Sequence, residues 1–379
     1  MSTILIKNGT LIDGSGSKRY LADIFIENEK IKKIGKLDLT ADKVIDASGK
    51  IVSPGFIDTH SHSDLKVLIE PFVEPKIRQG ITTEILGQDG ISMAPLPEEY
   101  VSSWRKNLAG LDGDSDELKW DWKNTDGYLN LISKTGSGPN ELYLVPHGNI
   151  RMEAMGLEAR VATKEELEKM KEITRREMEA GVAGLSTGLI YIPCAYAETE
   201  ELIEICKVAA EYGRPLVIHQ RSEADTMLES MQEVIRIAKE SGVKIHFSHF
   251  KICGQKNWKL IEPVIALLDK CKEEGINVSY DQYPYVAGST MLGVILPPWA
   301  HAGGTDKLIE RLKDKSLRQK MKKDIIEGIP GWDNFIDFAG FDGIYVTSVK
   351  TDKNQDCIGK NLTEIAELRG KEKFDAVFD

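Results

Sequence analysis

The first fifty residues alternate apolar and polar side chains with the two-residue period of a β-strand. Three such runs occur, at residues 4–12, 22–34 and 43–52. The pair Asn8-Gly9 stands between two apolar stretches of the first run, and residues 27–30 interrupt the second, so both are predicted turns. We therefore expect a small β module over residues 1–53.

Beyond residue 54 the apolar positions recur with helical spacing in four long segments. Thr163 stands three residues before Glu166, which is the pattern of a capping box at a helix start. Each segment stops at or just before a glycine, the residue that most often follows a helix. The predicted helices cover residues 163–181, 199–213, 223–241 and 256–274.

Short apolar runs between these helices are typical of strands, at residues 82–87, 141–146, 182–186, 215–219, 244–249 and 277–281. Ile51 to Ile57 adds a seventh run, which we predict to be one buried strand. Strands that alternate with helices form parallel sheets. We therefore predict an α/β fold of the (β/α)8 TIM-barrel type over residues 54–379, in which the residues that end the strands meet at one edge. These residues are His60, Asp89, His147, Ser186, His219, His249 and Asp281.

A segment at about residues 97–140 interrupts the alternation between the second and third strands. It contains Trp104, Trp120 and Trp122. These aromatics could line an acyl pocket, although ordinary helix packing is the favoured role. We expect the insertion to lie over the mouth of the barrel.

Composition narrows the class of protein. The 379 residues are 41% hydrophobic and 29% charged, and the net charge of −11 is spread along the chain, which favours neither nucleic acid nor an anionic membrane as a partner. The chain shows no signal-peptide pattern and no apolar run long enough to span a membrane. Five cysteines without CxxC spacing indicate reduced thiols, so we predict a cytoplasmic location.

The candidate chemistry begins with His60 and His62 after the first predicted barrel strand. Positions two apart on an extended chain point the same way, so the two imidazoles can bind one metal ion, with zinc first in line. His219 and His249 end two later strands and extend the pair to a cluster. A catalytic zinc activates water for attack on a carbonyl, so hydrolysis of an amide or a related C–N bond is the reaction class indicated.

Asp89 follows the second barrel strand in the segment Gly87-Gln-Asp-Gly90. It could be an anionic metal ligand or a turn residue, and the sequence leaves both interpretations open. His246 lies three residues before His249 and should face away from the barrel interior, so packing or exposure is favoured for it over metal binding.

Five motifs in order connect the chain to a known family. They are Pro54-Gly-Phe-Ile-Asp-Thr-His-Ser-His-Ser-Asp64, Gly184-Leu-Ser-Thr-Gly-Leu189, His219-Gln-Arg-Ser-Glu-Ala-Asp225, Ser248-His-Phe-Lys251 and Tyr280-Asp-Gln-Tyr-Pro-Tyr285. With them the chain resembles the amidohydrolase superfamily, and most closely its N-acyl-D-amino-acid deacylase (D-aminoacylase) family. The resemblance implies a metal-dependent barrel flanked by a small β-sandwich, and hydrolysis of N-acyl-D-amino acids to a carboxylate and a D-amino acid.

The resemblance also implies roles for single residues. His219 and His249 match the tight zinc ligands of the family, and His60 and His62 match the ligands of a second, weaker or vacant, metal position. The substrate carboxylate would be held by three residues: Lys251, Tyr283 and Ser289. The expected cofactor is thus Zn²⁺ at one tight site with a second site possible, and the expected partner is a small-molecule substrate.

Two departures from the family pattern matter. The family commonly has a cysteine where this chain has Asp89, and a carboxylate is a harder ligand than a thiolate, so the metal preference changes. The family's catalytic aspartate belongs to a Ser-Asp-Gly motif on the eighth barrel strand, and no such motif follows residue 300. We therefore expect the eighth strand and the C-terminal part to be missing, and the catalytic residue stays unassigned.

Two alternatives to a deacylase follow from the same residues. A cyclic amide hydrolase of the dihydroorotase or hydantoinase type would usually carry a carbamylated lysine on strand four, where this chain has Gly184-Leu-Ser-Thr-Gly188. A non-catalytic amidohydrolase-like protein would be expected to lose its metal ligands, whereas the four histidines are present. The oligomeric state is left open.

Overall fold

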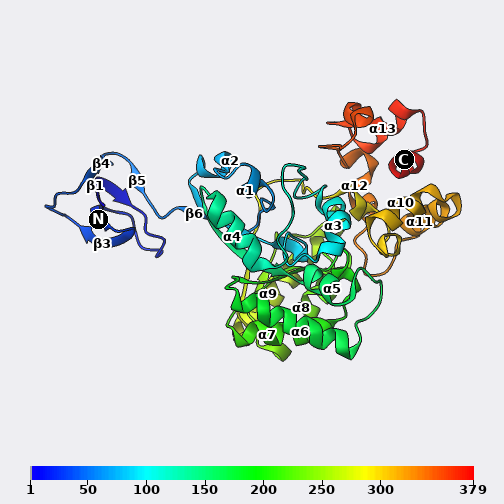
Figure 1. Ribbon diagram of the computed structural model, residues 1–379, viewed down its shortest axis with the longest axis horizontal. Helices are drawn as coiled ribbons and strands as arrows, with labels where there is room; N and C mark the ends of the chain where they lie inside the picture. Colours follow the sequence, from blue (N-terminus) through cyan, green and yellow to red (C-terminus); the bar gives the residue numbers. More distant parts are fainter. Residues whose placement is uncertain (1) are drawn as a thin grey trace.

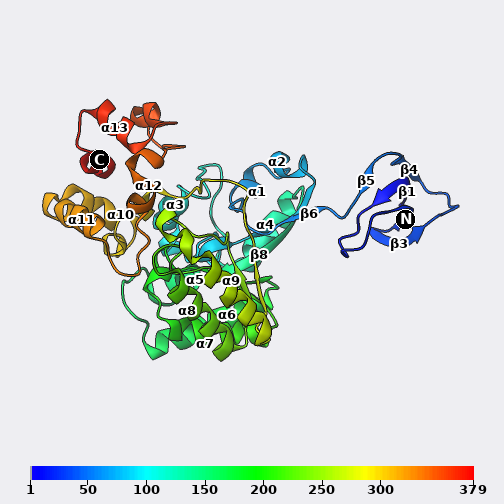
Figure 2. The ribbon, with the colours of Figure 1, turned by 180° about the vertical axis from the view of Figure 1, so that it is seen from behind.

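The computed structural model describes residues 2–379. The N-terminal module is one five-stranded sheet in the order β3-β2-β1-β4, with β5 also paired to β1. Figures 1 and 2 show it beside the rest of the chain, joined through the segment between β5 and β6. Its strands are β1 (Thr3–Leu11), β2 (Tyr20–Glu27), β3 (Lys30–Gly35), β4 (Lys43–Asp46) and β5 (Ile51–Val52).

The predicted turn at Asn8-Gly9 is wrong, whereas the turn at residues 27–30 is confirmed. β1 runs through Asn8 and Gly9 with only a shift of register against β2. Asn8 has a φ of 61°, and its N–H donates to Asp23 Oδ1 at 2.8 Å instead of continuing the ladder. The local signal of a hairpin therefore marks a bulge in a continuous strand.

The prediction of one buried strand from Ile51 to Ile57 is also wrong. The segment splits into β5 of the N-terminal sheet and β6 (Phe56–Asp58) of the second sheet. Proline and glycine at residues 54–55 separate the two pieces because proline has no N–H for a ladder. Ile51, Phe56 and Ile57 are exposed, since both pieces lie at the margins of their sheets.

The second sheet has seven parallel strands in chain order, as the alternation of strands and helices predicts. Every strand therefore ends at the same edge of the sheet. After β6 the strands are β7 (Ile81–Leu86), β8 (Asn140–Pro146), β9 (Gly184–Gly188), β10 (Leu216–His219), β11 (Ile245–Phe247) and β12 (Val278–Tyr280).

The four helices predicted between the later strands are present, and α5, which was not predicted, follows β8. Thr163 caps α6 through the predicted capping box with Glu166. The helix predicted from residue 223 begins only at Met227, because the residues before it are bound elsewhere: Glu223 N–H donates to Asp333 at 2.8 Å. These helices are α5 (His147–Met155), α6 (Lys164–Glu179), α7 (Thr199–Glu211), α8 (Met227–Ser241) and α9 (Ile261–Glu273).

The insertion packs against the main core with α3 (Val101–Leu108) and α4 (Thr125–Thr135). The indole N–H of Trp104 donates to Ser92 O and that of Trp122 to Met93 O, both at 2.7 Å. Both rings are buried, so the structure supports the packing role of these tryptophans.

Residues 295–379 are mainly helical and have their own hydrophobic core, which includes Met321, Ile325, Leu362, Phe374 and Phe378. Figure 2 shows these helices as a group beside the sheet region. The predicted division at residues 53/54 stays a prediction. The remaining helices are α1 (Lys66–Ile69), α2 (Glu74–Ile77), α10 (Thr305–Lys313), α11 (Lys315–Glu327), α12 (Phe335–Gly343), α13 (Leu362–Arg369) and α14 (Lys373–Phe378).

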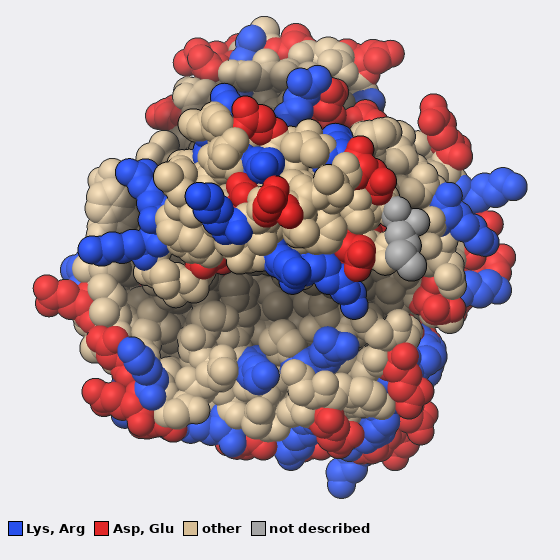
Figure 3. All heavy atoms as spheres, turned by 90° about the vertical axis from the view of Figure 1, so that its left-hand side faces the viewer, with Lys and Arg blue, Asp and Glu red and all other residues tan. Residues whose placement is uncertain are grey.

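The surface carries charges of both signs. Basic and acidic side chains are interspersed over the face in Figure 3 and leave no area of a single sign there. Within residues 2–379, no helix has both the length and the apolar character needed to cross a bilayer.

Candidate metal centre

Asp89 and four histidines meet at the edge where the parallel strands end. We call His219 and His249 the inner pair, and His60 and His62 the outer pair. His219 is the last residue of β10 and His249 follows β11, while the outer pair follows β6. The structure thus brings together all five predicted ligands.

Asp89 lies between the two pairs and faces both with different oxygens. Its Oδ2 is 3.7 Å from His60 Nε2 and 3.4 Å from His62 Nε2, whereas its Oδ1 is 3.7 Å from His249 Nε2. His219 Nδ1 completes the inner group, 2.8 Å from His249 Nε2. In each group of three residues the potential ligand atoms lie within 4.8 Å of one another, and Asp89 belongs to both groups.

The backbone holds Asp89 in place through tight packing of its neighbours. A Cβ on Gly87 would lie 2.1 Å from Leu144 O, and one on Gly90 would lie 2.7 Å from Thr187 Cα. Asp89 itself has a φ of 56°, in the left-handed region. It is therefore a turn residue and also faces the histidines, so the two interpretations left open by the sequence are compatible.

The electrostatics of the group favour cations. Burial opposes ionisation of Asp89, but the charge of His60 and hydrogen bonds from the histidines hold its pKa well below the usual value. Burial, together with the charge of His249, lowers the pKa of His219 to about 3, so its ring is neutral and free to bind metal at pH 7.

The other histidines have carboxylates on both sides. Burial lowers the pKa of His249, but Glu223 and Asp89 outweigh it and raise the value to about 9. For His62 the same balance, with Asp112 and Asp89 opposing burial, raises the pKa to about 10. This concentration of buried carboxylates around imidazoles stabilises positive charge, whether protons or metal ions.

The predicted substrate-binding residues are only partly assembled. Lys251 Nζ donates to Glu223 Oε2 at 2.5 Å and to His249 O at 3.1 Å, so it is paired within the protein. It lies 5.5 Å from the centre of the Tyr283 ring. Ser289 is exposed, and a Cβ on its neighbour Gly288 would be 3.3 Å from the Tyr283 hydroxyl.

Three residues close to the centre were not singled out from the sequence. Glu223 Oε1 lies 3.0 Å from His249 Nδ1 and can accept a hydrogen bond from it. Its position inside the motif that begins at His219 is the sequence signal that could have identified it. The Tyr191 ring stands edge-on to His219, 5.5 Å between ring centres. Asp112 approaches His62 from the insertion, and no spacing in the sequence connects the two.

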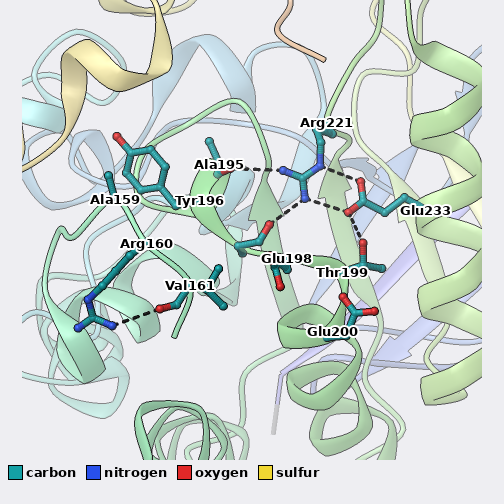
Figure 4. Close-up of a pocket in the computed structure, with 11 residues that line it drawn as sticks. Ala159, Arg160, Val161, Ala195, Tyr196, Glu198, Thr199, Glu200, Arg221 and Glu233 are labelled. Carbon is teal, nitrogen blue, oxygen red and sulfur yellow. Dashed lines mark hydrogen bonds and ion pairs between the residues drawn. The ribbon is translucent and has the colours of Figure 1, made fainter. Parts of the chain in front are cut away.

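His246 and a pocket at the start of α7 both lie outside the group of five potential ligands. His246 Nε2 is 2.8 Å from Asp281 Oδ2, and His246 belongs to neither group of potential ligands. A pocket of about 580 Å³ lies where α7 begins, and Figure 4 shows Arg221 in its wall, bound to Glu233 and to Ala195 O. None of the five potential ligands lines this pocket.

Comparison with known proteins gives a consistent result. A family model described as "Amidohydrolase family" matches residues 43–273. The D-aminoacylase and the N-acyl-D-glutamate deacylase of Alcaligenes xylosoxydans xylosoxydans are each 36% identical over 290 residues, which are 76% of this chain. The match spans 58% of the length of these curated relatives.

Two solved structures are also similar to this one. The N-acyl-D-glutamate deacylase from Bordetella bronchiseptica, complexed with zinc and a phosphonate mimic of the tetrahedral intermediate, has a TM-score of 0.80 at 31% identity, over 99% of this chain and 69% of its own. A D-aminoacylase studied for its binuclear metal centre has a TM-score of 0.78 at 30% identity, with the same shares of the two chains covered.

Proposed function

This chain belongs to the amidohydrolase family, and from that premise we propose that it hydrolyses the amide bond of N-acyl-D-amino acids to a carboxylate and a D-amino acid. The observation that carries the proposal is the position of Asp89, whose two oxygens face two pairs of histidines. The names of the relatives supply the substrate class, since they are deacylases of D-amino acids.

The residues present fit a metal centre. Asp89 Oδ1, which faces His249 of the inner pair, is buried and has no hydrogen-bond partner among residues 2–379. Imidazoles and a carboxylate suit zinc, and we propose one tight site at the inner pair and a second at the outer pair. When bound, zinc polarises an amide carbonyl and activates water as a nucleophile.

The same chain would orient the substrate through Lys251, Tyr283 and Ser289. Lys251 Nζ also lies 3.0 Å from His249 Nδ1 and 3.1 Å from His249 O, so it would give up one of these contacts to donate to the substrate carboxylate and keep its bond to Glu223. Tyr283 lies next to Lys251 and would add a hydroxyl donor. With the amide at the metal centre and the carboxylate at Lys251, the side chain and the hydrogen of the α-carbon exchange places between the two enantiomers, so the surface that meets these two substituents would select the D-enantiomer.

A cyclic amide hydrolase has less support. Ser186 and Thr187 of β9 are buried and engaged, Ser186 Oγ with Gly87 O and Thr187 Oγ1 with His147 Nδ1. β9 supplies no lysine for a carbamate, so the shared ligand is left to Asp89.

The test compares enantiomers on the full-length protein. Metal per chain is first measured by plasma mass spectrometry on protein purified without chelator, and we expect about one zinc or more. N-acetyl-D-methionine should then be hydrolysed at least about 100-fold faster than its L counterpart, because the wrong enantiomer leaves buried polar groups unpaired. Equal rates on the two enantiomers would contradict the proposed substrate class, and the absence of metal in folded, zinc-treated protein would contradict the proposed centre.

A further inference from the structure

Asp112 is a buried carboxylate that the proposed function does not use. Its side chain has no exposed surface, and neither oxygen has a hydrogen-bond partner within residues 2–379. Its Oδ1 lies 3.6 Å from Nδ1 of His62, and that nitrogen is also buried without a partner. Burial of an unpaired carboxylate is costly, so a positively polarised N–H is the group that this position requires.

Two other histidines, His249 and His60, show the same arrangement. His249 Nε2 faces Asp89, and its Nδ1 is 3.0 Å from Glu223 Oε1. His60 Nε2 also faces Asp89, and its Nδ1 is 3.9 Å from Asp281 Oδ2. Three rings thus direct Nε2 to the centre and Nδ1 to an outer carboxylate. A carboxylate in that place fixes the tautomer of a metal-binding histidine and makes its other nitrogen a stronger ligand.

Asp112 differs from the other two outer carboxylates because it comes from the insertion. Its own N–H donates to Leu108 O at 2.9 Å, at the end of α3. Arg105 of the same helix holds the loop that follows, with 2.8 Å to Asp114 Oδ1 and 2.7 Å to Asp116 Oδ1. The loop is therefore anchored, and the carboxylate is presented from outside the sheet.

We propose that Asp112 is a positioning residue for the outer pair: it accepts the Nδ1–H of His62, so that Nε2 of His62 is free to bind the second metal ion beside Asp89. This proposal rests on the proposed metal centre, but it does not depend on the substrate. It makes the insertion, and not only the sheet, a determinant of how tightly the second ion is held.

The test measures zinc affinity at both sites in the full-length protein by titration against a competing chelator. Asp112→Asn keeps the shape and removes the charge, and we expect the second zinc to bind about 10–100-fold more weakly while the first is unchanged. Asp121→Asn is the matched control, because Asp121 lies in the same insertion, is exposed and takes no part in holding the loop that carries Asp112. Equal weakening at both sites, or none at either, would overturn the proposal.

A second measurement separates positioning from a general structural effect. In a His62→Ala background, Asp112→Asn should cause no further loss of zinc affinity, because the partner through which it acts is gone. The same loss in both backgrounds would show that Asp112 acts by another route.

A third measurement needs no substitution at Asp112. Nitrogen NMR of histidine-labelled, zinc-loaded protein should find His62 protonated at Nδ1, with a slowly exchanging proton. Protonation at Nε2 would overturn the proposal. Protein that binds one zinc only would also overturn it and leave the proposed function standing, whereas protein that binds none would overturn both.

Discussion

The inner and outer pairs share one carboxylate, yet the chain supports them differently. The inner pair stands on β10 and β11, which are neighbours in the sheet and have further strands on both sides. The outer pair comes from a single loop after β6, the strand at one end of the sheet order. The side chains of His219 and His249 are 6% and 10% exposed. Those of His60 and His62 are 15% and 19% exposed.

The two pairs therefore differ in what fixes the distance between their histidines. Strand register sets the distance between His219 and His249, since Ile218 pairs with Phe247, one residue before His219 and two before His249. No such register links His60 to His62, so their geometry depends on the groups around the loop, including Asp112. We therefore expect the inner pair to bind metal more tightly than the outer pair.

Removing the shared carboxylate of Asp89 should weaken zinc binding at both pairs of histidines. Asp89→Ala takes one ligand from each group, so zinc affinity should fall at both sites by more than about 100-fold, beyond the cost of losing an outer-shell partner. Mass spectrometry of dialysed protein would then find no bound zinc. Retention of one full equivalent would show that Asp89 is not shared.

Removing an inner ligand should have the next largest effect. His249→Ala should release the tightly held zinc and reduce hydrolysis of N-acetyl-D-methionine by more than about 100-fold. His301→Ala is a control for metal content, because this half-buried histidine bonds to Gly293 O and belongs to neither group. Full zinc content in the His249 variant would remove it from the ligand set.

Removing an outer ligand should separate the two sites. In His60→Ala the second zinc should bind about 100-fold more weakly, while the first equivalent stays bound, since His60 shares only Asp89 with the inner pair. Titration with zinc, followed by rate measurements at each stoichiometry, tests this. A parallel loss of both ions would mean that the pairs form one inseparable site.

The smallest expected effect concerns Glu141 on β8. Burial raises the pKa of Glu141 on β8 to about 7, against a hydrogen bond from Ser137. A raised folded-state pKa means that the native state favours the protonated form, so this contribution to stability is complete below about pH 4.5 and is lost as the pH rises through about 7. Glu141→Gln should therefore stabilise the protein at pH 8, by on the order of 1 kcal/mol after allowance for solvent screening, and leave it unchanged at pH 4.5.

Thermal unfolding at the two pH values checks this expectation. Glu172→Gln on the exposed side of α6 is the control for the loss of one negative charge. A stabilisation of equal size at both pH values would contradict the titration of Glu141 as its cause.

Much of the scaffold was predictable because its signals are local. The capping box at Thr163 depends on residues three apart, and strands between helices can pair in parallel in few ways. The convergence of Asp89, His219 and His249 followed in turn, because parallel strands end at one edge.

The errors arose where a distant partner decides the outcome. Asn8-Gly9 has the local pattern of a hairpin, but Asp23 captures the N–H of Asn8 and the strand continues. Asp112 lies fifty positions beyond His62 on an irregular loop, so only the docking of the insertion brings them together. The pairing of Lys251 with Glu223 is likewise visible only in three dimensions, while the role of Lys251 in holding the substrate carboxylate stays a prediction.

The chain order of the seven strands has a consequence for synthesis on the ribosome. Each strand pairs with its predecessor, so the sheet can grow one strand at a time as the polypeptide emerges. The outer pair and Asp89 are made early, but His249 emerges 160 residues after Asp89, so a nascent chain holds an incomplete group of ligands for most of its growth. Capture of an ion at the inner pair is therefore possible only after β6 to β11 have been synthesised.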